Sequence, residues 1–286
     1  MASNKAMILL IILVIVSRLP LLSGGFGADG DGWRIAKTAL TLWNDGVYHV
    51  SRFPGFPLYE FIQTPIIAIG GSVASNISSL FIFIVSLLIF RKILHRWNIP
   101  HSDIVLIAYA FLPILWKNSS LTMDYVWGLC GIVSAVYFVE QRRFIVAGIV
   151  LGLAAGTRIF HIAYLLPAFL LFQKDDRKHW WIFFVTALST TIVCYVPVFF
   201  SEGYGLVVRD YLADTRNYST LRKIGFYFYR LIFSLGLLEW ISIVTAVVLN
   251  KKKLSRCFRN TFLLVQLHVL LQDCCCLLFY QMNGNI

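Results

Sequence analysis

Residues 144–172, FIVAGIVLGLAAGTRIFHIAYLLPAFLLF, form an apolar run that is broken near its middle by Gly156-Thr157-Arg158. Basic residues flank it, with Arg143 before and Lys174 after. Because positively charged loops stay on the cytoplasmic side, an even number of membrane crossings should separate these flanks. Each half has about 13–14 residues, roughly 20 Å of helix, which is short of the ~30 Å hydrocarbon core. The run therefore predicts two short or tilted helices that meet at Arg158.

Similar apolar runs recur along the whole chain. Of its 286 residues, 58% are hydrophobic and 14% are charged, and the mean hydropathy is +0.74. A soluble domain carries about 25% charged residues, so the composition excludes that class. We expect an all-α fold, a polytopic transmembrane helical bundle that forms a single domain over residues 1–286, with a C-terminal end that reads as truncated.

The apolar runs predict about nine membrane crossings, with the broken pair at Arg158 counted as two. The predicted spans cover residues 6–22, 65–90, 104–115, 125–139, 144–172, 180–200, 229–249 and 262–280. Residues 23–63 form a large first extracytoplasmic loop. Its amphipathic stretches near 31–43 and 57–63 are expected to lie along the membrane interface as short helices.

The net charge of +11 would indicate a nucleic-acid partner in a soluble protein. Here most basic residues gather in five short segments beside the spans. These are Lys5; Arg91, Lys92 and Arg96; Arg142 and Arg143; Lys174, Arg177 and Lys178; and Lys251, Lys252, Lys253, Arg256 and Arg259. The positive-inside rule places these segments on the cytoplasmic side. We therefore interpret the charge mainly as a topology signal, with contact to membrane lipids second and no nucleic-acid partner.

An acidic stretch, Gly27-Ala28-Asp29-Gly30-Asp31-Gly32-Trp33-Arg34, follows the first span. Carboxylates next to a membrane exit are costly to keep near lipid unless they face water or a partner. Asp29 and Asp31 are candidates for the general base on an acceptor hydroxyl, or for ligands of a divalent cation, Mg²⁺ or Mn²⁺. The alternative is a solvated, glycine-rich turn.

Two further polar positions fall on the same predicted face. Asp124 opens the span 125–139 and is a catalytic candidate, although capping of that helix is a sufficient alternative. Arg158 lies between two short apolar helices, where a charged side chain is a functional candidate by default. Its expected partner is Asp29, Asp31, Asp124 or a ligand phosphate.

Three more arginines are candidates for binding the phosphate of a donor. Arg34 closes the acidic stretch, Arg52 opens a turn rich in proline and glycine, and Arg209 lies in the predicted outer loop 201–226. A guanidinium binds phosphate with two parallel hydrogen bonds. A structural turn for Arg52 and a solvated face for Arg209 are the alternatives.

The order of these stretches resembles the GT-C superfamily of integral membrane glycosyltransferases, which includes the protein O-mannosyltransferases. Four pieces carry the resemblance, and together they cover about residues 1–170. They are Asp29-Gly30-Asp31-Gly32-Trp33-Arg34; Gly46-Val47-Tyr48 with Ser51-Arg52-Phe53-Pro54-Gly55-Phe56-Pro57; Met123-Asp124; and residues 148–158, which end in arginine.

The resemblance implies transfer of a sugar from a polyprenyl-phosphate donor to an acceptor hydroxyl of a glycan, lipid or protein. The reaction is expected on the non-cytoplasmic face of a multi-pass protein in the plasma membrane or endoplasmic reticulum. Asp31 would be the leading candidate for general base, with Asp29 as its rival or metal partner. Arg158 and an outer-loop arginine would stabilise the leaving phosphate. The superfamily contains metal-dependent and metal-independent members, so the resemblance leaves open whether the reaction needs a divalent cation.

Two other classes fit the same features. A transporter or lipid-linked oligosaccharide translocase would line a pathway with these charges, and a non-catalytic subunit of a membrane complex would use them structurally. A transporter should carry polar residues on both faces and often internal repeats. Here the acidic candidates cluster on one face and no repeat is visible, which favours the enzyme.

Overall fold

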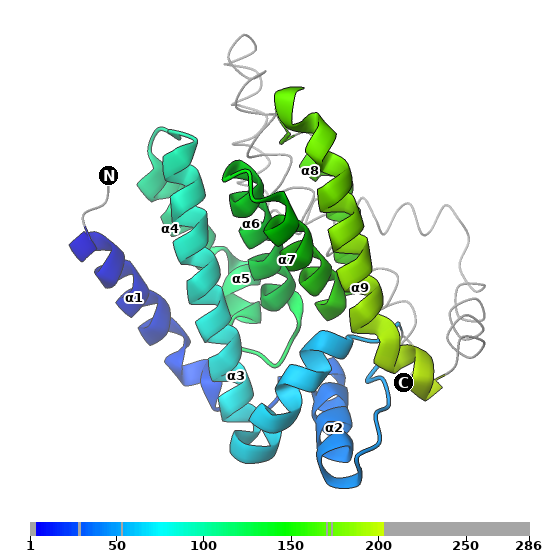
Figure 1. The fold of residues 1–286 in the computed structure, drawn as a ribbon. Coiled ribbons are helices and arrows are strands. Elements are labelled where there is room, and N and C mark those ends of the chain that lie inside the picture. The colour runs from blue at the N-terminus through cyan, green and yellow to red at the C-terminus, as the bar shows by residue number, and fades with distance from the viewer. Residues whose placement is uncertain (1–3, 28–29, 53, 170, 173, 203–286) are drawn as a thin grey trace, which may run out of the picture. The chain divides into compact units, whose positions relative to one another are not determined.

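The computed structural model describes residues 4–27, 30–52, 54–169, 171–172 and 174–202. Within these ranges all regular elements are helical and no strand occurs, which confirms the all-α class (Figure 1). Three helices are long and apolar enough to cross a membrane, and three shorter ones are also apolar. The chain is therefore a polytopic helical membrane protein. The predicted spans 229–249 and 262–280 lie outside the described residues.

The chain divides into two compact units, residues 1–165 with 172–203 and residues 166–171 with 204–286. The described helices belong to the first unit, apart from most of α8 (Leu165–Phe169). In chain order the others are α1 (Asn4–Leu22), α2 (Gly30–Asp45), α3 (Pro57–Arg96), α4 (Ser102–Phe111), α5 (Pro113–Asn118), α6 (Tyr125–Glu140), α7 (Phe144–Thr157), the 3-10 helices η1 (Ile159–Tyr164) and η2 (Lys174–His179), and α9 (Trp180–Glu202).

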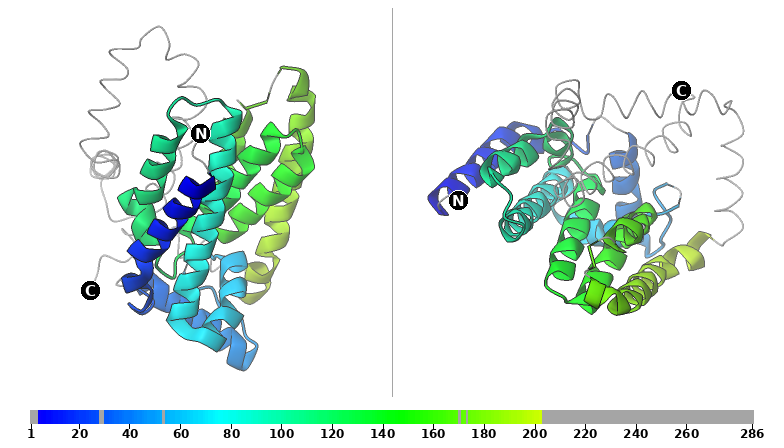
Figure 2. Two further views of the ribbon diagram at one scale, coloured as in Figure 1. Left: turned by 90° about the vertical axis from the view of Figure 1, so that its left-hand side faces the viewer. Right: turned by 90° about the horizontal axis from the view of Figure 1, so that it is seen from above.

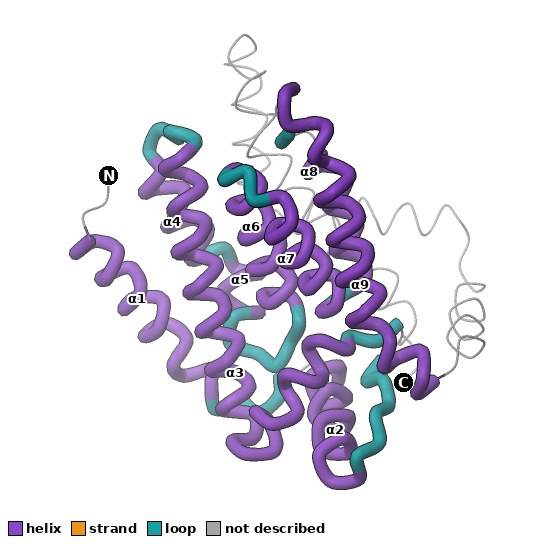
Figure 3. Tube along the Cα trace, viewed as in Figure 1, coloured by secondary structure: helices purple, strands orange, loops and turns teal. Residues whose placement is uncertain are grey.

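Within the first unit, α7 packs against both α6 and α9, and α3 packs against α1, α2, α4 and α6. Helix α2 and the first turns of α3 lie at one end of the bundle, which we call the α2 end (Figures 1 and 2). The connections from α3 to α4 and from α6 to α7 lie at the opposite end (Figure 3). This arrangement matches the alternating sidedness that the basic segments predict.

Small residues bring α7 close to α9. A Cβ atom added at Gly148 or Gly152 would lie 2.6 Å from the carbonyl oxygen of Phe183 or Ala187, respectively. Only glycine permits such a close backbone approach, as is common between helices in membranes. Helix α7 is thereby fixed in position, and so is the residue that follows its last turn, Arg158.

The predicted break at Arg158 is confirmed. Helix α7 ends at Thr157, and Arg158 is extended, with φ −163° and ψ 116°. The segment after it differs from the expected second helix, because it forms the 3-10 helix η1 and then the short α8. His161 in η1 bonds through Nδ1 to the carbonyl of Ala154 at 2.9 Å and packs against Gly128, so it serves the packing of this turn.

The predicted second span begins differently from expectation. Residues 57–63 and 65–90 were expected as an interfacial stretch and a separate span, but α3 continues through Pro65 and is interrupted at Gly71, with φ 60° and ψ −150°. Glycine adopts this conformation without a Cβ clash, whereas a proline inside a helix removes one hydrogen bond without requiring a positive φ. The change of direction therefore falls at Gly71.

The predicted third span, 104–115, is also two helices. Leu112 between α4 and α5 has φ −55° and ψ 124°, which is not helical. The residue before a proline avoids the α conformation because of the proline ring, and Pro113 follows Leu112 directly. The chain therefore reaches the α2 end through a short helix, α5, just before Asp124.

Candidate active site

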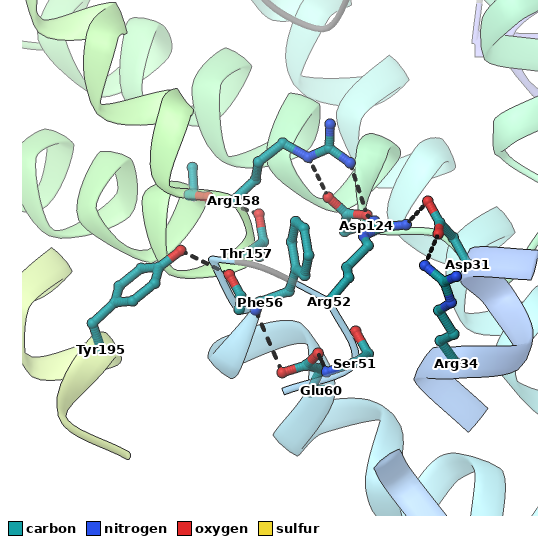
Figure 4. Close-up of polar contacts among 12 residues, drawn as sticks. Asp31, Arg34, Ser51, Arg52, Phe56, Glu60, Asp124, Thr157, Arg158 and Tyr195 are labelled. Atoms are coloured by element: carbon teal, nitrogen blue, oxygen red, sulfur yellow. Dashed lines mark hydrogen bonds and ion pairs between the residues drawn. The ribbon is translucent and has the colours of Figure 1, made fainter. Parts of the chain in front are cut away.

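Five charged side chains from four parts of the sequence meet at the α2 end (Figure 4). We call this group, Asp31, Arg34, Arg52, Asp124 and Arg158, the ionic cluster. Asp31 and Arg34 come from the first two turns of α2, and Arg52 from the loop before α3. Asp124 immediately precedes α6, and Arg158 immediately follows α7.

Asp124 is the buried centre of the cluster, with no exposed surface. Arg158 donates to it from Nε to Oδ2 at 2.6 Å and from Nη2 to Oδ1 at 3.2 Å. Arg52 donates from Nη2 to Oδ1 at 2.8 Å. Both oxygens of Asp124 are thus engaged by guanidinium groups, and the two-pronged contact fixes the plane of the Arg158 guanidinium.

Arg52 links the two carboxylates of the cluster. Its Nη1 pairs with Oδ2 of Asp31, while its Nη2 pairs with Asp124. Arg34 approaches the other oxygen of Asp31 at 3.7 Å. The side chain of Asp31 keeps 18% of its surface exposed, against 0% for Asp124. Asp31 is therefore the carboxylate of the cluster that solvent and ligands can reach.

Aromatic rings hold the two buried guanidiniums. The Phe56 ring centre lies 4.3 Å from Cζ of Arg52 and 5.4 Å from Cζ of Arg158. The Tyr125 ring centre lies 4.3 Å from Cζ of Arg158. A cation over a ring face is attracted by the negative charge of that face, and the attraction is stronger when water is excluded. The rings therefore limit where the guanidiniums can move.

A buried carboxylate, Glu60, organises the loop that carries Arg52. Glu60 accepts hydrogen bonds from the Tyr48 hydroxyl at 2.5 Å and from the backbone N–H groups of Ser51 at 2.9 Å and Phe56 at 3.4 Å. From α9, the Tyr195 hydroxyl donates to the carbonyl of Gly55 at 3.0 Å (Figure 4). These bonds hold the loop against α3 and α9 and so place Arg52 beside Asp124.

The electrostatics of the cluster favour an anion. Burial raises the pKa of Asp124, but the Arg158 and Arg52 guanidiniums lower it by more, so its pKa lies below the ordinary range of aspartate. Asp124 is therefore charged at neutral pH. Three arginines oppose two aspartates, which leaves one excess positive charge in the cluster.

The structure brings together most of the residues that the sequence singled out. Asp31, Arg34, Arg52, Asp124 and Arg158 meet, and Asp124 is a partner of Arg158, one of the expected choices. Arg34 lies at the margin with 46% of its side chain exposed. Asp29 and Arg209 lie outside the described residues. Among the described residues, no group of three or more His, Cys, Asp or Glu side chains is arranged to hold a metal ion.

Sequence reasoning did not assign roles to Glu60, Phe56 or Tyr125. Glu60 did carry a signal, because it is an acidic residue in the first turn of a long apolar helix. The role of the two rings has no sequence signal of its own. Their positions over the guanidiniums follow from packing between segments distant in the chain.

The fold and the cluster together define a helical membrane protein with an anion-stabilising site at one end of its bundle. The model of glycosyltransferase family 87 matches residues 58–270, more than half of the chain. The chain therefore belongs to glycosyltransferase family 87.

One curated relative is GPI mannosyltransferase 1 of Kluyveromyces lactis, 29% identical over 93 residues. The matched region covers 32% of this chain and 23% of that protein. No solved structure matches the chain. The family and this relative confirm the resemblance to GT-C membrane glycosyltransferases.

Proposed function

We propose that this protein is a membrane glycosyltransferase that moves a sugar from a polyprenyl-phosphate donor to an acceptor hydroxyl. The observation that carries the proposal is the ionic cluster, in which the partly exposed carboxylate of Asp31 pairs with the buried Arg52, and Asp124 joins Arg52 to a second buried arginine, Arg158. A mannosyl donor is the first to test, because the relative in Kluyveromyces lactis is named a mannosyltransferase. The acceptor is a hydroxyl of a glycan, lipid or protein.

In this proposal Asp31 is the general base. The acceptor oxygen attacks the anomeric carbon, its proton passes to the Asp31 carboxylate, and the bond between that carbon and the phosphate oxygen breaks. A base at hydrogen-bond distance contributes typically 10²–10⁴-fold to such a step. The exposure of Asp31 supports this assignment, because a base must reach its substrate. Asp29 is the rival for this role.

Arg52 and Arg158 bind the donor phosphate in the proposal and stabilise the negative charge that develops as it leaves. Fixed cations in a site with little water are effective for this purpose because they need no rearrangement during the reaction. Arg34 and Arg209 are further candidates for the same phosphate. Asp124 is a positioning residue, since it is fully buried, it holds the two arginines in place, and its low pKa makes it a weak base.

A divalent cation at Asp29 and Asp31 is the less favoured version of the mechanism. Carboxylate oxygens suit Mg²⁺ and Mn²⁺. However, both oxygens of Asp31 face guanidinium groups of Arg34 and Arg52, and this positive surrounding does not fit a cation. We therefore derive the reaction without one.

The proposed site faces the non-cytoplasmic side. The basic pairs Arg91 with Lys92 and Arg142 with Arg143 belong to the opposite end of the bundle, and the positive-inside rule assigns such segments to the cytoplasm. The donor lipid and the acceptor would then meet at the outer leaflet or on the lumenal side.

The test is a transfer assay in vesicles with a panel of labelled polyprenyl-phosphate sugars. We expect Asp31→Asn to lose at least 10²-fold of the transfer rate while the protein still folds, because the amide cannot take the proton. The matched control is Asp45→Asn, the same change at an exposed position of the same helix, which should keep the rate. The enzyme proposal fails if the unmodified protein transfers no sugar from any donor. The assignment of Asp31 fails if Asp31→Asn retains the full rate.

A further inference from the structure

A second charged site lies at the opposite end of the bundle from the ionic cluster. The last turns of α3 and the first two turns of α4 line an open cavity of about 280 Å³. This is far more than one water molecule requires. The cavity therefore has room for a larger group, and its lining indicates which kind.

The lining combines positive charge with an apolar wall. Arg91, Lys92 and His95 contribute the basic side chains, and Leu88 and Leu106 contribute the wall. Asp103 is the acidic residue of the lining, so with a neutral His95 the lining keeps one excess positive charge. Lys92 is held in part by the Tyr137 ring, whose centre lies 5.6 Å from its Nζ. An anion is the favoured occupant.

We propose that this cavity binds the phosphate headgroup of an anionic phospholipid in the leaflet at this end. A free phosphate ion has no apolar part that could contact the wall. A phospholipid does, because its acyl chains lie close to its phosphate. Leu88 supports the lipid, because it lines the cavity and 38% of its surface is exposed on a membrane-crossing helix, where an acyl chain can reach it. Basic pockets between transmembrane helices on the cytoplasmic side bind anionic headgroups in this way.

The proposal is independent of the transfer reaction, because the cavity shares no residue with the ionic cluster. It also differs from a general attraction of basic loops to the membrane. Arg143, just before α7, and Lys178, in η2, are exposed basic residues that do not line the cavity. Neutralising these two residues changes the net charge by as much as neutralising Arg91 and Lys92 does, but it leaves the cavity lining intact. It therefore provides a matched control.

The first test measures thermal stability of the full chain in detergent against increasing dioctanoyl phosphatidylglycerol. Dioctanoyl phosphatidylcholine and inorganic phosphate serve as the other probes. We expect the anionic lipid alone to raise the midpoint of unfolding. In the double variant Arg91→Gln/Lys92→Gln, the phosphatidylglycerol concentration that gives half of the maximal stabilisation should rise about tenfold or more. The reason is that each basic residue near a headgroup contributes to binding. Arg143→Gln with Lys178→Gln should change it less than twofold.

Equal shifts in the two double variants would overturn the proposal, and so would equal stabilisation by inorganic phosphate. A second measurement uses the unmodified protein, so it does not depend on a variant that folds. A photoreactive group near the headgroup of phosphatidylglycerol should crosslink to residues 88–106, mapped by mass spectrometry. Crosslinks confined to the segments around Arg143 and Lys178 would contradict a lipid in this cavity.

Discussion

Arg52 lies between two carboxylates, with Asp31 on its exposed side and Asp124 on its buried side. Two residues of the same type, both paired with Arg52, therefore have different surroundings at one site. Asp124 has no exposed surface and is surrounded by guanidiniums, so its contribution is to hold them in place. Asp31 keeps contact with the surroundings, which a proton acceptor needs. Burial, more than residue type, separates the roles that we propose for them.

Replacement of Asp124 by asparagine should destabilise the protein. The change leaves Arg52 and Arg158 buried without their shared counter-charge, and removal of one partner of a buried ion pair costs about 3–5 kcal/mol. We expect a lower midpoint of thermal unfolding in detergent, together with a lower transfer rate. Asp45→Asn, at an exposed position, is the control and should leave the midpoint unchanged. An unchanged midpoint in Asp124→Asn would show that the buried pairs contribute no net stability.

The pH dependence follows from the lowered pKa of Asp124. A group whose pKa is lower in the folded state stabilises the fold fully above its unfolded pKa, about 3.9 for aspartate, and loses this contribution as the pH falls through the folded value. The Asp124 contribution should therefore stay constant from pH 8 to pH 5 and fall only below about pH 4. The measurement compares unfolding midpoints of the unmodified protein and Asp124→Asn across this range. A difference that already shrinks between pH 7 and pH 5 would contradict the lowered pKa.

At the scale of elements, the interruption of α3 at Gly71 decides how the site is supported. The turns before it carry Glu60, which organises the Arg52 loop, and the turns after it pack against α6. Likewise, the end of α7 at Thr157 places Arg158 in extended backbone beside Asp124. The ionic cluster thus depends on where helices stop or turn.

Gly71→Ala should lower the stability of the protein. No atom lies within 4 Å of a Cβ placed at Gly71, so the cost is that of the backbone conformation, with φ 60° and ψ −150°. Residues held in such sparsely populated regions cost about 1–3 kcal/mol each. Gly30→Ala is the control, because its surroundings are equally open and its φ is not in the positive region. Equal unfolding midpoints for the two variants would contradict the observed backbone at Gly71.

At the scale of the whole described bundle, the two ends carry different charged sites. The ionic cluster lies at the α2 end, and the lipid cavity proposed above is lined by the end of α3 and the start of α4. The connection between these two helices lies at the opposite end of the bundle (Figure 3). A sugar donor and an anionic lipid would thus be bound at opposite membrane surfaces. This separation requires the α2 end to face the non-cytoplasmic side and the opposite end to face the cytoplasm, which labelling can test directly.

Cysteines introduced at Asp45 and Lys178 should react from opposite sides of a sealed vesicle. Both positions are exposed, and they belong to the two ends of the bundle. The background for this experiment has the native cysteines replaced, including the buried Cys130. The measurement is labelling by a membrane-impermeant maleimide before and after permeabilisation. Labelling of both positions from one side would contradict the topology and the proposed location of the site.

Much of the fold was predictable because its signals are local. Helices α1, α6 and α9 begin within two residues of the predicted 6, 125 and 180, since each is an apolar run with polar or basic flanks. The break at Arg158 was predictable for the same reason. The interruption at Gly71 was not, because both Pro65 and Gly71 can bend a helix and packing selects between them.

The sequence by itself determined that this chain is an apolar helical bundle and predicted that its acidic and basic candidates share one face, because composition and charge bias act residue by residue. Only the tertiary structure decided which carboxylate meets which arginine. Asp124 and Arg52 are 72 positions apart, and Asp124 and Arg158 are 34 apart. Such pairs form only after α3, α6 and α7 have packed, and burial then makes Asp124 a structural anion and leaves Asp31 partly exposed.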